Sequence, residues 1–160
     1  MRKIQSGFTL IELVVVITIL GILAAIALPR FTALQADARL AKMNGAMGSV
    51  KAAAAMAHAT LITRGFDSSF TGTPVPAIVM EGVAVVYTNG YPDAATIVPL
   101  AGLAAPDYVI TGLTAPQVAA PDANHIGATA ATDCTISYTP AAAANTLPTY
   151  GFAATLATCA

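Results

Sequence analysis

Residues 7–29 read GFTLIELVVVITILGILAAIALP, by far the most apolar part of the chain. Between Leu13 and Leu28 no residue is charged, and Glu12 is the one acid near the start of the run. As a helix, residues 8–28 would be about 31 Å long, which matches the roughly 30 Å hydrocarbon core of a bilayer. No second run of this kind follows, so the sequence predicts a single membrane-spanning helix and not a channel or transporter.

The composition is that of a folded chain rather than a disordered one. Of the 160 residues, 56% are hydrophobic and 9% are charged, and the mean hydropathy is +0.71; disordered chains show the opposite balance. All seven Lys and Arg residues lie within residues 1–64, whereas the part beyond Arg64 carries six acids and no basic residue. Because an anionic segment cannot form a phosphate-binding surface, no nucleic-acid site is expected there.

A short basic leader, Met1–Gly7, precedes the apolar run. An ordinary cleaved secretory signal also starts with basic residues, and Ala24–Ala27 loosely resembles the cleavage site of such a signal. However, those signals have apolar cores of about 7–15 residues, which the uncharged run reaches or exceeds. Glu12 is also unusual in a segment that is to be discarded. The apolar run is therefore expected to stay in the mature protein.

Five residues of this region form one recognisable pattern. Gly7 is followed by Phe8, Glu12 stands at the fifth position after that junction, Gly21 lies within the run and Pro29 lies at its end. Together with the basic leader, this pattern resembles the type III signal of type IV pilins and the related pseudopilins. The resemblance implies that a membrane-bound prepilin peptidase cuts after Gly7 on the cytoplasmic side and methylates the new amine of Phe8.

Glu12 is expected to have a function, because placing a carboxylate within a membrane span costs free energy and such a residue usually marks a functional site. One interpretation is a Glu that lies near the lipid headgroups. The resemblance implies instead that Glu12 pairs with the Phe8 amine of a neighbouring subunit and sets the register of assembly. Gly21 and Pro29 both weaken a helix. They mark either an ordinary kink or, as the resemblance implies, a stretch that unwinds inside a filament.

After Pro29 the apolar residues become periodic and predict an amphipathic helical stem over residues 30–64. The stripe recurs at spacings of three and four, as one face of a helix requires. The sequence Thr63-Arg64-Gly65 is a helix stop signal, so one helix from Phe8 to Arg64 would be about 85 Å long if unbroken. The small residues Gly45, Gly48 and the alanines at positions 52–55 are expected to permit close approach of helices or of a sheet. The stripe consists of Leu40, Met43, Met47, Val50, Ala54, Ala57 and Leu61.

Beyond the stem, the sequence predicts a small head with a thinly packed β-sheet. Nine of the ten prolines lie after Gly65 and exclude long helices there. A turn is expected at Asn89-Gly90, and Asp93 is expected to cap a short helix. The predicted helix covers residues 94–103, and the predicted strands cover residues 83–88, 135–139 and 149–155.

Cys134 and Cys159 are the only cysteines. In a chain exported across the inner membrane they are expected to form a disulfide, which closes a C-terminal loop. A metal site is the alternative, with His125 as the only other soft ligand nearby. The sequence Asp122-Ala-Asn124-His125 superficially resembles part of a calcium loop, but it offers too few oxygen ligands. No metal and no cofactor are therefore expected.

No catalytic motif is present, and the few histidines and cysteines leave little for acid–base or nucleophilic chemistry, so no catalytic residue and no enzyme activity are expected. Three further segments resemble the mannose-sensitive haemagglutinin type of pilin. They are residues 29–39, Gly90-Tyr91-Pro92 and residues 133–139, and no sugar-site motif accompanies them.

The sequence thus predicts an α+β chain with the type IV pilin fold, in which a long N-terminal helix packs on a small antiparallel sheet. The expected parts are a cleaved leader (1–7), a membrane and filament-core helix (8–29), the stem (30–64) and the head (65–160). The expected function is that of a pilin that forms a homopolymeric filament for adhesion, motility or DNA uptake. Its expected partners are the prepilin peptidase, the pilus assembly machinery and, before assembly, the inner membrane; the filament itself would be extracellular. A pseudopilin of type II secretion is the first alternative, and a membrane-tethered periplasmic binding module or enzyme is the second.

Overall fold

The computed structural model describes residues 8–113, 116–126 and 133–160, with the side chains of Thr32 and Ala33 excepted. It divides into two compact units, the first ending at Gln35 and the second comprising Ala36–Ala160. This division falls inside the predicted stem, and the four predicted parts of the chain remain predictions.

The long helix α1 (Leu10–Thr63) confirms the helix predicted from the apolar run and the stripe, to within two residues at its start. Its end has a local cause. Gly65 takes a φ of +82°, its N–H donates to the carbonyl of Ile62 (2.9 Å), and the next N–H, of Phe66, donates to the carbonyl of Leu61 (3.3 Å). This pair of bonds is the Schellman motif, in which a left-handed glycine closes the last turn.

In the second unit, the stripe on α1 forms the centre of the core. Six of its seven residues are buried, and Leu40 is half-buried against them. Of the small residues expected to permit close approach, Ala53 and Ala54 are buried in this core, whereas nothing in the unit approaches Gly45 or Gly48, where a Cβ would meet nothing within 4 Å. The small residues that allow close packing are buried alanines of the same helix, namely Ala46, Ala53, Ala54 and Ala57.

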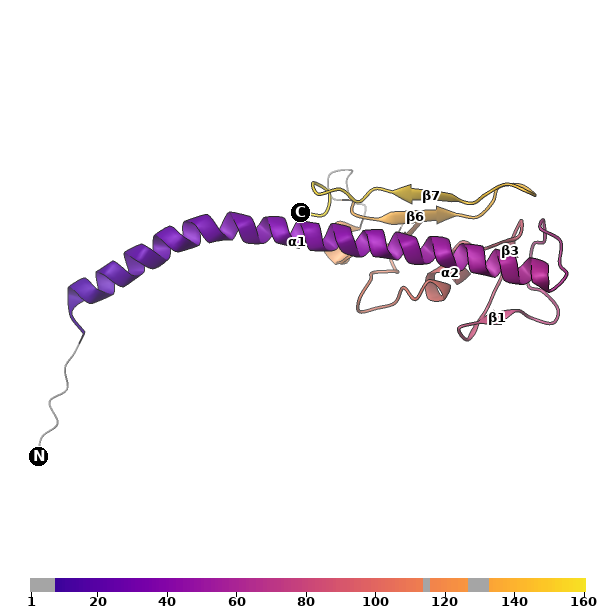
Figure 1. Ribbon diagram of the computed structural model, residues 1–160, viewed down its shortest axis with the longest axis horizontal. Helices are drawn as coiled ribbons and strands as arrows, with labels where there is room; N and C mark the ends of the chain where they lie inside the picture. Colours follow the sequence, from indigo (N-terminus) through magenta and orange to yellow (C-terminus); the bar gives the residue numbers. More distant parts are fainter. Residues whose placement is uncertain (1–7, 114–115, 127–132) are drawn as a thin grey trace, which may run out of the picture. The chain divides into compact units, whose positions relative to one another are not determined.

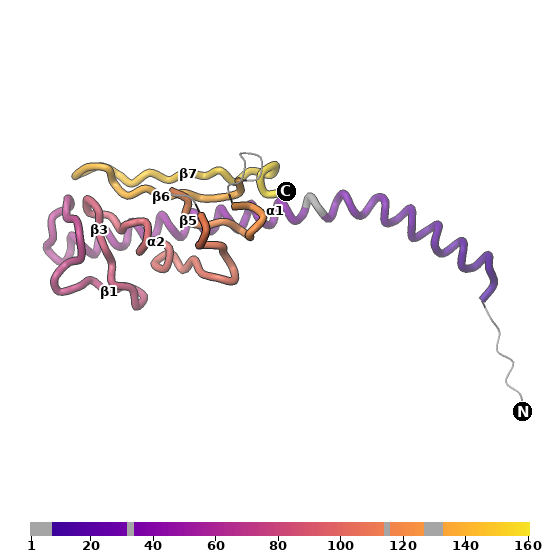
Figure 2. Tube along the Cα trace, turned by 180° about the vertical axis from the view of Figure 1, so that it is seen from behind, coloured from indigo at the N-terminus to yellow at the C-terminus, as the bar shows by residue number. Residues whose placement is uncertain are grey.

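Among the described residues, three small antiparallel sheets follow α1, so the α+β class is confirmed. The largest has the order β5-β6-β7, and β6 pairs with β7 in a continuous register from Ile136↔Phe152 to Thr139↔Thr149. In both views β6 and β7 run side by side along the part of α1 in the second unit (Figures 1 and 2). The strands are β1 (Val79–Met80), β2 (Val83–Ala84), β3 (Tyr87–Thr88), β4 (Tyr91–Pro92), β5 (Gln117–Ala119), β6 (Ile136–Thr139) and β7 (Thr149–Phe152).

The single strand predicted over residues 83–88 was wrong, because the segment changes partners midway and is divided between β2 and β3. Val85 donates its N–H to the carbonyl of Ile78 (2.9 Å), whereas Tyr87 exchanges backbone bonds with Gly72 (2.8 and 2.9 Å). The turn after it is confirmed. Asn89 and Gly90 have φ values of +48° and +83°, as a two-residue type I′ hairpin requires.

The short helix α2 (Ala94–Leu100) begins as predicted, since the carboxylate of Asp93 accepts the N–H of Thr96 at 2.8 Å. It ends three residues earlier than predicted because Gly102 takes a φ of +69° and closes the helix. A 3-10 turn, η1 (Ala123–His125), precedes β6. The predicted strands over 135–139 and 149–155 are confirmed as β6 and β7, with β7 ending at Phe152.

Candidate functional site

The first turn of α1 is closed by reciprocal hydrogen bonds between Thr9 and Glu12. The carboxylate Oε2 of Glu12 accepts the backbone N–H of Thr9 (2.9 Å) and its hydroxyl (2.7 Å), while the N–H of Glu12 donates to the Thr9 hydroxyl oxygen (3.3 Å). This is a capping box, which satisfies N–H groups that have no partner within the helix. Thr9 was not among the predicted site residues, although a Thr three residues before a Glu at the start of an apolar run is the signature of this motif.

The helix surface around this turn is apolar and exposed. Phe8 is 91% exposed, and it borders a shallow groove of about 350 Å³ that Glu12 also lines. The other residues that line the groove are Ile11, Val15 and Val16. By length and composition, α1 is the one helix among the described residues able to cross a membrane. So large an apolar surface requires lipid or another protein as its neighbour.

Three other residues were proposed for processing or helix flexibility, namely Gly7, Gly21 and Pro29. Gly7 lies outside the described residues. Gly21 and Pro29 lie inside α1, and the helix continues through both. A Cβ at Gly21 would meet nothing within 4 Å, so the first unit itself does not require a glycine there. Their role as points of flexibility remains a prediction.

In the second unit, Cys134 and Cys159 form a disulfide, and both are fully buried in the main core. His125 does not join them as a metal ligand. It lies instead between the carboxylate of Asp122 and the carbonyl of Ala160. Within the described residues, no group of three or more His, Cys, Asp or Glu side chains is placed to hold a metal ion.

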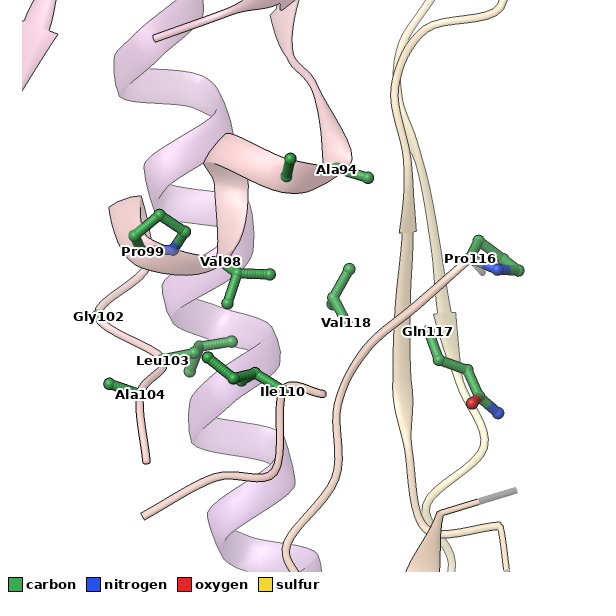
Figure 3. Close-up of a pocket in the computed structure, with 11 residues that line it drawn as sticks. Ala94, Val98, Pro99, Gly102, Leu103, Ala104, Ile110, Pro116, Gln117 and Val118 are labelled. Carbon is green, nitrogen blue, oxygen red and sulfur yellow. The ribbon is translucent and has the colours of Figure 1, made fainter. Parts of the chain in front are cut away.

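The second unit contains a cavity of about 550 Å³ between α2, β5 and the segment that joins them (Figure 3). Figure 3 shows the side chains of Val98, Leu103, Ile110 and Val118 turned toward this space. Its lining has no titratable side chain, and Gln117 is its only residue with a polar side chain. The cavity therefore offers none of the groups that acid–base or nucleophilic catalysis uses.

The buried tyrosines act as hydrogen-bond donors within the core. Tyr138 donates its hydroxyl to the carbonyl of Pro92 (2.8 Å), and Tyr87 donates to the carbonyl of Ala57 (3.1 Å). Burial raises the pKa of both phenols above its usual value near 10. Neither phenol ionises near neutral pH, as expected of groups that only donate hydrogen bonds within the core.

Comparison with known proteins places the N-terminal segment in a class. Residues 2–28 match the family model described as the prokaryotic N-terminal methylation motif. The chain is 42% identical over 53 residues to the Type IV major fimbrial protein FimA of Dichelobacter nodosus, which covers 33% of the chain and 34% of the relative. It is 51% identical over 52 residues to the Type IV narrow pilus major component PilA5 of Thermus thermophilus, covering 32% of the chain and 45% of the relative.

A third relative, the Type II secretion system core protein G of Pseudomonas aeruginosa, is 50% identical over 54 residues, which is 34% of the chain and 36% of the relative. The chain thus spans about a third of the length of the curated fimbrial relatives that it matches. No solved structure matches it significantly. These matches confirm the resemblance to type IV pilins with a type III signal. The finer resemblance to the mannose-sensitive haemagglutinin type remains a prediction.

Proposed function

We propose that this protein is the structural subunit of a type IV pilus and polymerises through the first half of α1 into an extracellular filament. The observation that supports this most is the match of residues 2–28 to the methylation motif, together with the exposed apolar side chains of α1 from Leu10 onward. A helix of this kind is stable in the inner membrane before assembly and against other copies of itself afterwards. Adhesion, motility or DNA uptake would be properties of the assembled filament.

In this proposal the prepilin peptidase removes residues 1–7 and methylates the amine of Phe8. The pilus assembly machinery then moves the subunit from the inner membrane into the filament. The Glu12 carboxylate would receive the Phe8 amine of a neighbouring subunit. In the free subunit that carboxylate already accepts two hydrogen bonds from Thr9, so its charge is partly compensated before a partner arrives.

We further propose that the protein has no enzymatic activity. Two of the relatives are named as a major fimbrial protein and as a major pilus component, and no titratable side chain lines the cavity of the second unit. The similarity to a type II secretion core protein keeps a pseudopilin as the competing function. The two functions differ in their product, because the filament of a pseudopilin is short and periplasmic.

The test is to express the protein in a host with a type IV pilus system and image the cells by electron microscopy. We expect long external filaments that contain this subunit, with mass spectrometry showing a methylated Phe8 at its N-terminus. Glu12→Ala should be inserted and cleaved normally but form few or no filaments. Asp37→Ala is the matched control, since it removes an exposed carboxylate from the same helix and should assemble normally. Processed protein without external filaments would favour the pseudopilin, and an intact Met1 would contradict both.

A further inference from the structure

The cavity between α2, β5 and the segment that joins them, here named the α2 cavity, is open to solvent. Leu103 and Val118 line it and are only 3% and 4% exposed, whereas Ala94 and Ala104, which also line it, are exposed. Its volume of about 550 Å³ is far larger than the gaps that a packed core leaves empty. An open apolar cavity of this size indicates a binding site for an apolar group.

An exposed acid, Asp107, stands beside the α2 cavity. It lies in the segment that joins α2 to β5, between two residues that line the cavity. Lys42 donates to the backbone carbonyl of Asp107, but the ion pairs among the described residues both involve Asp122 and none involves the Asp107 carboxylate. Because the chain has no Lys or Arg beyond Arg64, a cation that pairs with Asp107 has to come from α1 or from another molecule.

The end of α1 carries the complementary groups, an apolar side chain and a cation. Met56, Thr60 and Arg64 are spaced by four residues and form one ridge along the helix. The N–H of Arg64 donates to the carbonyl of Thr60 (3.1 Å), so Arg64 continues this ridge by one turn. Met56 is 61% exposed, and Arg64 is exposed and takes part in no ion pair within the described part of the chain. The helical rise separates the two by about 12 Å.

The ridge and the cavity both belong to the second unit but lie in different places on it. Both views place the last turn of α1 at the end of this unit farthest from the C-terminus, with α2 between the two ends (Figures 1 and 2). A contact that joins two different surfaces of identical subunits is heterologous. When such a contact does not close into a ring, its repetition builds a helical filament.

We propose that a second copy of this chain occupies the α2 cavity. Met56 of one subunit enters the cavity of its neighbour, and Arg64 of the same subunit pairs with Asp107 of that neighbour. The proposal rests on the proposed function, because it requires a filament of identical subunits. Charge complementarity selects the occupant. No titratable side chain lines the cavity, so it accepts the uncharged and flexible Met side chain, and the acid beside it attracts the cation of the ridge.

The test exchanges the two charges in a host that carries a type IV pilus system. Filaments are sheared from the cells, and mass spectrometry measures which share of the total subunit they contain. Arg64→Asp and Asp107→Arg should each lower this share about tenfold, because two like charges then face one another. The double variant Arg64→Asp/Asp107→Arg restores the pair with its signs exchanged, and its share should return to within about twofold of the wild type.

The matched control places the new cation elsewhere. Arg64→Asp/Glu81→Arg has the same net charge as the exchanged pair, but Glu81 is exposed between β1 and β2, so its filament share should stay as low as in Arg64→Asp. Recovery in this control, no loss in the single variants, or no recovery in the exchanged pair would overturn the interface alone. Wild-type cells without filaments would contradict the proposed function, and the interface with it.

Met56 provides the decision if a charge variant does not fold. Its side chain is mostly exposed in the subunit, so its substitution should leave the Tm of the subunit unchanged. Met56→Leu keeps an apolar side chain of similar volume and should assemble like the wild type. Met56→Gln should lower the filament share about tenfold, because the cavity would bury an amide without a partner. Equal filament shares in these two variants would refute the interface.

Discussion

The hydroxyl of Tyr138 offers the sharpest test of how the second unit is held together. Tyr138 is fully buried, and its hydroxyl donates to the carbonyl of Pro92, which is also buried. Tyr138→Phe keeps the ring and leaves that carbonyl without its donor. A buried acceptor left unsatisfied costs about 1–3 kcal/mol. For a domain of this size, that cost lowers the Tm by about 3–12 °C.

Tyr150→Phe is the matched control. Its ring lies 5.6 Å from that of Tyr138, measured between centroids, and it packs on the same core while remaining half-buried. Among the described residues its hydroxyl has no hydrogen-bond partner, so its removal should change the Tm little. Differential scanning calorimetry of the full-length protein in detergent measures both variants. If Tyr138→Phe melts within about 1 °C of Tyr150→Phe, the reasoning from the buried bond is refuted.

The same hydroxyl predicts a pH dependence. Burial, with smaller contributions from neighbouring tyrosines and Asp93, raises the pKa of Tyr138 in the folded state. In the unfolded chain the phenol ionises near pH 10. The unfolded state therefore loses its proton first, and stability is fully present below pH 10 and falls as the pH rises above it. This alkaline slope should be shallower in Tyr138→Phe than in the wild type.

Two further predictions concern the turn and the disulfide of the second unit. Gly90→Ala should lower the Tm by several degrees, because Gly90 has a φ of +83° and an added Cβ would lie 2.1 Å from the carbonyl oxygen of Ser68. Gly45→Ala, which faces open space in a helix, should raise the Tm slightly, and the opposite order by calorimetry would contradict the close approach at Gly90. Cys134→Ser should lower the free energy of unfolding by about 2–4 kcal/mol. Denaturant titration with and without reductant checks this, and an unchanged midpoint on reduction would show that the disulfide does not stabilise the fold.

The parts of the structure that the sequence predicts well are those that a few neighbouring residues determine. The spacing of the stripe, the left-handed Gly65, the Asn89-Gly90 turn and the Asp93 cap each depend on a few neighbouring residues. The apolar run and its Glu12 likewise predict the exposed first half of α1. Thr9 also belongs to this group, since its signal was present and was missed.

The parts that could not be predicted depend on partners distant in the sequence. Residues 83–88 form two strands and not one because Ile78 and Gly72 form backbone hydrogen bonds with successive parts of the segment. The three-residue strand β5 is too short for an alternating pattern and has an irregular register. The ion pair between Arg39 and Asp122 joins two residues far apart in the sequence, and no local pattern predicts that they meet.

The division of the second unit into three small sheets has a consequence for how its surface can change. One core cluster joins α1 to α2 and the β5-β6-β7 sheet, and a separate cluster joins α1 to residues of the hairpins, such as Ile78 and Tyr87. The three sheets thus share two clusters on the helix, and Leu100 packs against both. A substitution that loosens one cluster leaves the helix in contact with the other, so a local change on the outer face of this unit need not release the whole face from the helix.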